Sequence, residues 1–222
     1  MGWRVIHHVL VLIRSQLRNE RRAGEVATVV IPFGAVALLV IPMAVGIETT
    51  LLARIGPGLF WAVVLLFGVL VTQRESGAEG PPQRDLLTLL GVDPAARFAA
   101  TAIANTILVL VFEVAVGAIA IVLYDPDVVG WGWIALVLPL VAAGLAMLGT
   151  IAASVTTGLG GRGALAPLLI APIAIPIMLG AAQATEGLRV GAGILRWVLV
   201  LAVVDVLLML AGVLTARPLE ES

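Results

Sequence analysis

The stretch FAATAIANTILVLVFEVAVGAIAIVL, residues 98–123, contains one charged side chain, Glu113, in an otherwise uncharged run. A helix of about 20 mostly apolar residues is long enough to cross the hydrocarbon core of a bilayer, so this stretch predicts a transmembrane helix. The rest of the chain has the same character: 61% of its 222 residues are hydrophobic, 12% are charged, and the mean hydropathy is +1.13. A soluble protein has roughly 25% charged residues. The sequence therefore predicts an all-α integral membrane protein.

Five further apolar runs bring the predicted number of transmembrane helices to six. The predicted spans cover residues 26–47, 58–72, 98–123, 131–156, 164–184 and 194–214. Six spans of about 20 residues each leave only short loops and two tails, so no second soluble domain fits. The predicted membrane domain is 26–214, and a short tail, 215–222, follows it.

Residues 1–25, which precede the first span, predict an amphipathic helix that lies in the membrane interface. Apolar side chains recur at helical spacing in WRVIHHVLVLIRSQLRNERR, residues 3–22, and the basic side chains fall largely on other faces. This run carries too many charges to cross the bilayer, but its arginines can reach lipid headgroups from the interface.

The distribution of arginine predicts the orientation of the spans. All thirteen basic residues are Arg, and with the amino terminus inside only Arg54, Arg189 and Arg196 fall on outside segments. Loops rich in basic residues stay on the cytoplasmic side of a membrane. We therefore expect both termini and the long polar segment 73–97 to be cytoplasmic.

The cytoplasmic segment 73–97 contains a short helical signal between two breakers. The helix lies after Gly-Pro-Pro and before Gly91 and Pro94, which limit it to one or two turns. Such a helix can dock in a groove of a cytosolic partner, or it can lie on the protein's own cytoplasmic face, and the residues alone leave both open. Its residues are Asp85, Leu86, Leu87, Leu89 and Leu90.

Glu113 and Asp205 are the only acidic residues well inside the predicted spans. An ionised carboxylate in the middle of a bilayer costs at least a few kcal/mol, so each should face protein or a water-filled cavity. One interpretation is a proton- or substrate-linked site. The other, which we favour for both residues, is a protonated or hydrogen-bonded carboxyl that fixes helix packing.

The remaining residues exclude most catalytic chemistry. There is no cysteine, and the only histidines, His7 and His8, lie outside the spans, so thiolate sites and an intramembrane Ser–His pair are ruled out. We expect no metal site, and the net charge of −1 argues against nucleic acid as a partner. The link GLGGRG, residues 158–163, lacks the Lys-Ser/Thr of a nucleotide loop. The chain is therefore not expected to be an enzyme, and any ATP must bind to another subunit.

The fifth predicted span contains three prolines, Pro167, Pro172 and Pro176. Each removes a backbone donor, and such breaks are tolerated where neighbouring helices or a cavity satisfy the freed carbonyls. The pattern indicates either a bent helix or a hinge that moves during a cycle.

The segment LLARIGPGLFW, residues 51–61, resembles the LLARI-x-PG-x-x-W signature of the CcmB family, the permease subunit of the haem exporter complex in cytochrome c maturation. Three further segments agree in order and spacing: DLLTLLGVDPAARFAA, the D-x-x-GW turn at 127–131, and the Gly-Arg-Gly link with the proline-rich span after it. The match covers nearly the whole chain. The residues of the signature block are Leu51, Leu52, Ala53, Arg54, Ile55, Pro57, Gly58 and Trp61.

The resemblance implies an ABC-2-type exporter-like permease of the bacterial inner membrane, present as a homodimer beside a separate cytosolic ABC ATPase. It also implies a haem-handling membrane protein and a small membrane subunit as partners, with haem as cargo and ATP bound only by the partner. ATP hydrolysis would drive haem export or release of the haem-loaded periplasmic chaperone. By the same analogy Asp85–Leu90 is the coupling helix and residues 1–25 form the elbow helix. The preceding loop, GAEGPPQRD, departs from the charged run usual in the family.

Two other functions fit the residues. A proton-linked secondary transporter would use Glu113 and Asp205 and would work without any ATPase. A non-transporting membrane scaffold would only tether assembly proteins and would be indifferent to ATP hydrolysis.

Overall fold

The computed structural model describes residues 24, 26–46, 48–76, 93–126, 130–158 and 165–216. The predicted interfacial helix, apart from Gly24, and the coupling helix Asp85–Leu90 lie outside the described residues. All regular structure in the described part is helical. In chain order the elements are η1 (Val26–Val30), α3 (Ile31–Val45), α4 (Thr49–Ser76), α6 (Pro94–Tyr124), α7 (Trp131–Gly158), α8 (Leu165–Arg189) and α9 (Leu195–Ala216).

Four of the described helices are long and apolar enough to cross a bilayer, and α3 belongs to a shorter apolar stretch. The all-helical membrane class is therefore confirmed, whereas the count of six spans and the interfacial helix stay predictions. The four candidate spans are Thr49–Thr72, Pro94–Tyr124, Gly132–Val155 and Leu195–Thr215.

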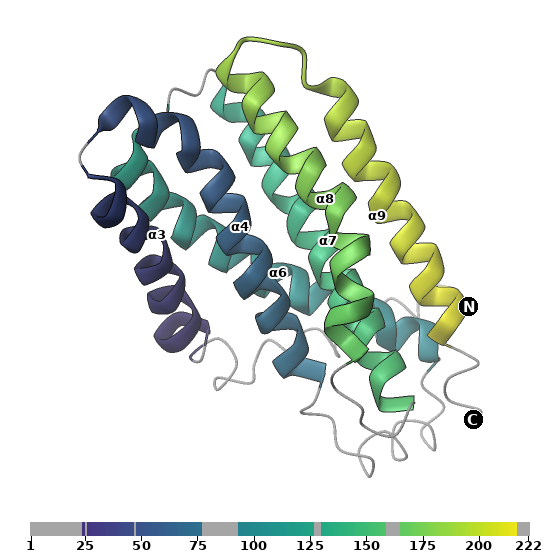
Figure 1. Cartoon of the computed structure of the whole chain (residues 1–222). Helices are drawn as coiled ribbons and strands as arrows, with labels where there is room; N and C mark the ends of the chain where they lie inside the picture. Colours follow the sequence, from purple (N-terminus) through teal and green to yellow (C-terminus); the bar gives the residue numbers. More distant parts are fainter. Residues whose placement is uncertain are drawn as a thin grey trace.

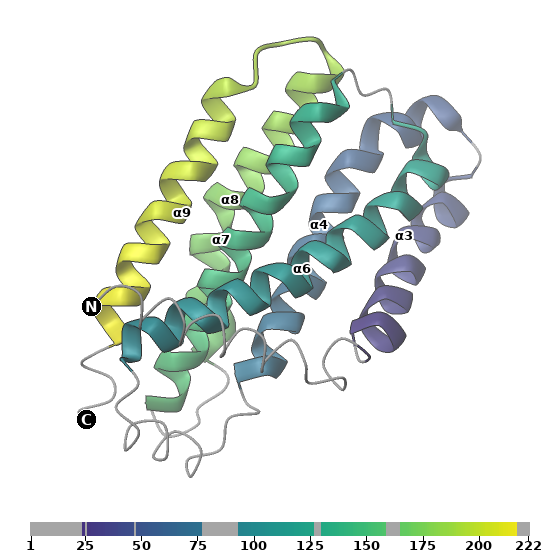
Figure 2. The same ribbon diagram turned by 180° about the vertical axis from the view of Figure 1, so that it is seen from behind.

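Helix α6 crosses the bundle diagonally and links its two sides. It contacts α7, α4, α3 and α9, and Figure 2 shows it running from α9 towards α3. Its 31 residues rise about 46 Å, more than the roughly 30 Å of a hydrocarbon core. A helix of this length has to tilt to remain within the bilayer, as the diagonal course indicates.

The start of α4 corrects the sequence-based prediction. A loop was expected over residues 48–57 and a span from 58, but α4 begins at Thr49 and continues through Pro57. A proline inside a helix removes only one donor, and packing against neighbouring helices compensates for it in membrane proteins. The block with the family signature is therefore helical throughout, not an external loop followed by a helix.

The end of α8 also differs from the prediction. The sequence predicted a span to 184 and a loop over 185–193, but the helix extends to Arg189 and includes Pro172 and Pro176. The polar residues after 184 bond within the helix: Thr185 donates to the carbonyl of Ala181 at 2.8 Å, for example. Loss of hydropathy marked the end of the apolar stretch, not the end of the helix.

Glycines allow close helix contacts on several sides of the bundle. A Cβ at Gly149 in α7 would overlap the side chain of Thr72 in α4, and one at Gly212 in α9 would overlap the ring of Phe98 in α6. Small residues let transmembrane helices approach until their backbones nearly touch. These contacts hold α7 against α4 and α9 against α6.

Candidate functional site

The signature block on α4 has two faces that meet different helices. On one face Leu52 is buried, and a Cβ at Gly56 would lie 2.6 Å from the Cβ of Tyr124 in α6. On the other face Arg54 and Pro57 line a groove shared with α8. The block therefore joins α4 to α6 and forms one wall of a groove towards α8.

Tyr124, the last residue of α6, contacts both α3 and α4. Its hydroxyl donates a hydrogen bond of 2.6 Å to the carbonyl of Leu38 in α3. Four residues later α3 has Pro42, which lacks the N–H that would bond to this carbonyl in a regular helix. The tyrosine supplies the donor that the proline removes, and Gly56 leaves room for it.

Trp61 connects α4 to α8 beneath the groove. Its indole N–H donates to the hydroxyl oxygen of Thr185 at 2.8 Å. Trp61 is 4% exposed and Thr185 is 7% exposed, so the hydrogen bond is shielded from solvent. It forms between residues 124 positions apart in the sequence and fixes the two helices relative to each other.

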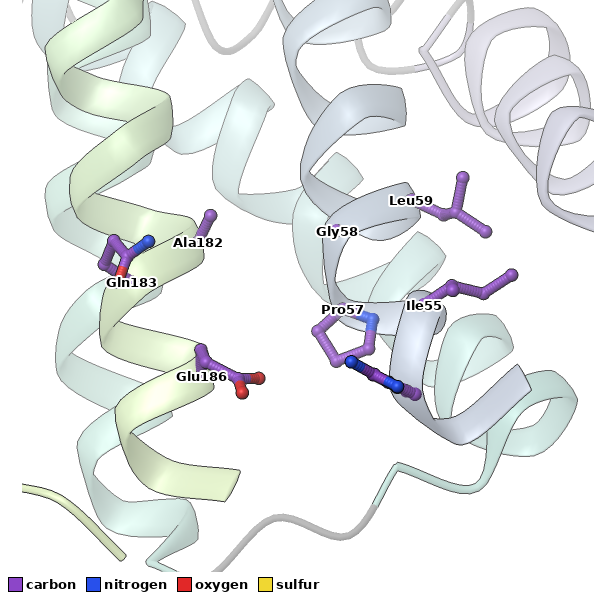
Figure 3. Close-up of a pocket in the computed structure, with 8 residues that line it drawn as sticks. Ile55, Pro57, Gly58, Leu59, Ala182, Gln183 and Glu186 are labelled. Carbon is purple, nitrogen blue, oxygen red and sulfur yellow. The ribbon is translucent and has the colours of Figure 1, made fainter. Parts of the chain in front are cut away.

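The groove is open and has a volume of about 430 Å³. It lies near the end of the bundle where, in Figure 1, the α3–α4 and α8–α9 connections are found. Figure 3 shows Glu186 extending from α8 towards Pro57 on α4. The residues that line the groove are Arg54, Ile55, Pro57, Gly58, Leu59, Ala182, Gln183 and Glu186.

The two charged residues that line the groove, Glu186 and Arg54, differ in their ion pairing. Glu186 accepts two hydrogen bonds from Arg189, one turn later in α8, with distances of 2.7 Å from Nε and 2.6 Å from Nη2. These bonds, and more weakly the charge of Arg54, lower the pKa of Glu186, which lies beyond the predicted span. Arg54 is exposed and forms no ion pair with any residue in the described part of the chain. Among the described residues, Arg54 is thus the lining residue of the groove whose charge has no ion-pair partner.

No hydrogen bond connects the two intramembrane carboxylates, Glu113 and Asp205. Glu113 is fully buried in α6, and neither of its oxygens has a hydrogen-bond partner among the described residues. Asp205 in α9 is half-buried, and its Oδ1 lies where a Cβ at Gly144 in α7 would be 2.8 Å away.

A buried polar pair lies two helical turns before Glu113 and was not predicted from the sequence. Asn105 in α6 donates to the hydroxyl of Thr150 in α7 at 3.2 Å, and its own carbonyl oxygen has no partner among the described residues. The sequence-based prediction of polar sites in the spans rested on acidic side chains alone. The uncharged amide of Asn105 within an apolar run was the signal that could have identified this contact.

Within the ranges that the structure describes, no three His, Cys, Asp or Glu side chains gather in a way that could hold a metal ion. The fold and these contacts define a polytopic helical membrane protein with an interhelical groove at one end of its bundle.

The chain belongs to the CcmB family, because the model of the CcmB protein family matches residues 7–221. It is 28% identical to the heme exporter protein B of Bradyrhizobium diazoefficiens, over 81% of this chain and 82% of that protein. It is 30% identical to the protein of the same name from Paracoccus denitrificans, over 82% of this chain and 84% of the relative. The heme exporter protein B of Rhodobacter capsulatus is also 30% identical, over 81% and 84%. The resemblance found in the sequence is thus confirmed.

Proposed function

We propose that this chain is the permease subunit of a haem exporter that acts in cytochrome c maturation. The observation that carries the proposal is the family match over residues 7–221, together with curated relatives named heme exporter protein B. The apolar helices of the described part suit a membrane subunit. ATP would be hydrolysed by a separate cytosolic ABC ATPase and would drive haem export or release of the haem-loaded periplasmic chaperone.

The proposed assembly is a homodimer in the bacterial inner membrane, beside the ATPase, a haem-handling membrane protein and a small membrane subunit. Both termini are cytoplasmic in this proposal, because ten of the thirteen arginines then lie inside. The open end of the groove then faces the periplasm. Asp85–Leu90 serves as the coupling helix that docks on the ATPase.

Leu86→Glu combined with Leu90→Glu tests the coupling helix. Two charges on the apolar side should prevent docking, so the ATPase should be lost from the purified complex while the chain remains in the membrane. The matched control is Gln83→Glu with Thr88→Glu, which adds the same charge to the same segment and spares the leucines. If the leucine variant co-purifies with the ATPase as wild type does, the coupling assignment is wrong.

One observation favours proton-linked secondary transport as a second candidate: the fully buried carboxyl of Glu113 without a partner. The lack of a hydrogen bond between Glu113 and Asp205 speaks against a joint site. Glu113→Gln separates the two functions, since a neutral amide cannot carry a proton in a transport cycle. We expect cytochrome c assembly to continue in this variant; assembly that stops with normal protein levels supports the secondary transporter.

The scaffold alternative is tested through the ATPase. If an ATPase that binds but does not hydrolyse ATP supports cytochrome c assembly normally, the chain is a scaffold and the permease proposal fails.

A further inference from the structure

We propose that the groove between α4 and α8 binds the head of a membrane phospholipid that has a primary ammonium group. The phosphate lies at Arg54, the ammonium lies at Glu186, and the acyl chains begin along the apolar wall of the groove. This inference goes beyond the proposed export function and does not depend on the identity of the cargo.

The depth of the groove in the membrane suits a lipid head. The candidate span of α4, Thr49–Thr72, rises about 36 Å, more than the roughly 30 Å of a hydrocarbon core, and Arg54 lies in its second turn. Arg54 therefore lies at one edge of the core, where long basic side chains extend to the phosphates. Glu186 lines the same groove from the last turn of α8 and so lies at the same level.

The groove presents one arginine and one carboxylate, a partner for each charge of a zwitterionic head. Arg54 has no ion pair among the described residues, so its guanidinium is free to bind phosphate through two parallel hydrogen bonds. The carboxylate of Glu186 is engaged by Arg189, but each carboxylate oxygen has a second lone pair for an ammonium group. A lipid head whose terminal group is anionic or neutral forms no ion pair with Glu186.

The remaining lining completes an amphipathic site. Gln183 adds an amide that can donate to a phosphate oxygen, and Ile55, Leu59 and Ala182 provide an apolar wall. The buried hydrogen bond between Trp61 and Thr185 keeps the two walls apart at a defined spacing.

Native mass spectrometry of the purified full-length protein tests the site, with equal amounts of phosphatidylethanolamine and phosphatidylglycerol of identical acyl chains. Wild type should retain phosphatidylethanolamine preferentially. Arg54→Gln should lower the lipid-bound fraction about tenfold, because a hydrogen bond to a charged group is lost. Glu186→Gln should abolish the preference between the two lipids.

Arg196→Gln is the matched control. Arg196 is an exposed arginine near the same end of the bundle, 4.9 Å from the ring of Trp197, and it does not line the groove. It should leave lipid binding and selectivity unchanged. Equal losses in the two arginine variants, or no preference in wild type, would overturn the proposal. Thermal unfolding in the same detergent shows whether Arg54→Gln is folded. If it is not, Arg54→Lys replaces it and should also lower the lipid-bound fraction, because an ammonium cannot form the two parallel hydrogen bonds of a guanidinium.

Haem is tested as a competing ligand, because with its propionates and its flat apolar ring it is also an anionic amphiphile. Haem added in excess should not displace phosphatidylethanolamine from wild type. If haem displaces the lipid from wild type, and haem itself binds less well to Arg54→Gln, the groove is a haem site and the lipid assignment is wrong. Failure of either arm leaves the ATPase test of the proposed function unaffected.

Discussion

The contacts of α4 on its two sides differ in kind. Towards α6 and α7 the helices touch through glycines, with Gly56 against Tyr124 and Gly149 against Thr72. Towards α8 the helices leave an open groove of about 430 Å³ and are connected by the hydrogen bond from Trp61 to Thr185. Close glycine contacts allow almost no displacement without overlap, whereas a single hydrogen bond beside a groove can be broken and re-formed. We infer that α4 is held more closely against α6 and α7 than against α8.

Among the variants that test this comparison, Gly149→Ala should lose the most stability. The new methyl group would overlap Thr72 in α4, and overpacking of this kind lowers the free energy of unfolding by about 1–3 kcal/mol or more. Gly132→Ala in the same helix is the control, because no atom lies within 4 Å of its added Cβ. Thermal unfolding in detergent measures both. Equal stability of the two variants would show that the contact is not close.

Tyr124→Phe removes the hydroxyl that donates to Leu38 and should be the next most damaging. The carbonyl of Leu38 is left without a donor because of Pro42, and an unsatisfied buried group costs about 1–3 kcal/mol. Thr215→Val, which removes an exposed hydroxyl that bonds within α9, should cost much less. If Tyr124→Phe loses little stability in the same unfolding assay, another donor must reach this carbonyl.

Thr185→Val probes the α4–α8 contact with almost no change in side-chain shape. The indole N–H of Trp61 loses its acceptor, and the expected loss of stability is about 1 kcal/mol. Because the groove leaves α8 room to adjust, the effect should be smaller than that of Gly149→Ala. A loss as large as that of the glycine variant would contradict the distinction between a rigid and an adjustable side of α4.

Removing the ion pair between Glu186 and Arg189 should cause the smallest loss of stability, and this loss should depend on pH. Because the folded state lowers the pKa of Glu186, the pair contributes stability above the ordinary carboxyl pKa of 4.5, and this contribution is lost as the pH falls through the lowered value. Unfolding temperatures of wild type and Arg189→Gln should therefore differ at neutral pH and converge as the pH falls through the lowered pKa of Glu186. A difference that grows in acid would contradict the pairing. Glu186 is 47% exposed, so the difference will be small at physiological salt.

The helices were predictable where hydropathy alone determines them. Helices α6, α7 and α9 cover the stretches where apolar runs predicted the third, fourth and sixth spans. The predictions failed at the start of α4 and the end of α8, because Pro57 and the polar residues after 184 were taken as helix ends. Both features are compatible with a helix once neighbouring helices or nearby turns satisfy the backbone.

The candidate site was predictable only in part. The resemblance identified Arg54, Pro57 and Trp61 as one block, but it gave no information about what they contact. Glu186 and Thr185 were assigned to a loop, and their position opposite the block depends on the packing of α8 beside α4. The interfacial helix and the coupling helix Asp85–Leu90 remain predictions.

The sequence by itself determined that this chain is an all-helical membrane protein of the CcmB family, because apolar length and local motifs are properties of contiguous residues. Only the tertiary structure decided which residues meet: Tyr124 at the carbonyl that Pro42 leaves free, Trp61 at Thr185, and Arg54 across the groove from Glu186. The physical reason is that these contacts join residues far apart in the chain, and helix packing sets their distances.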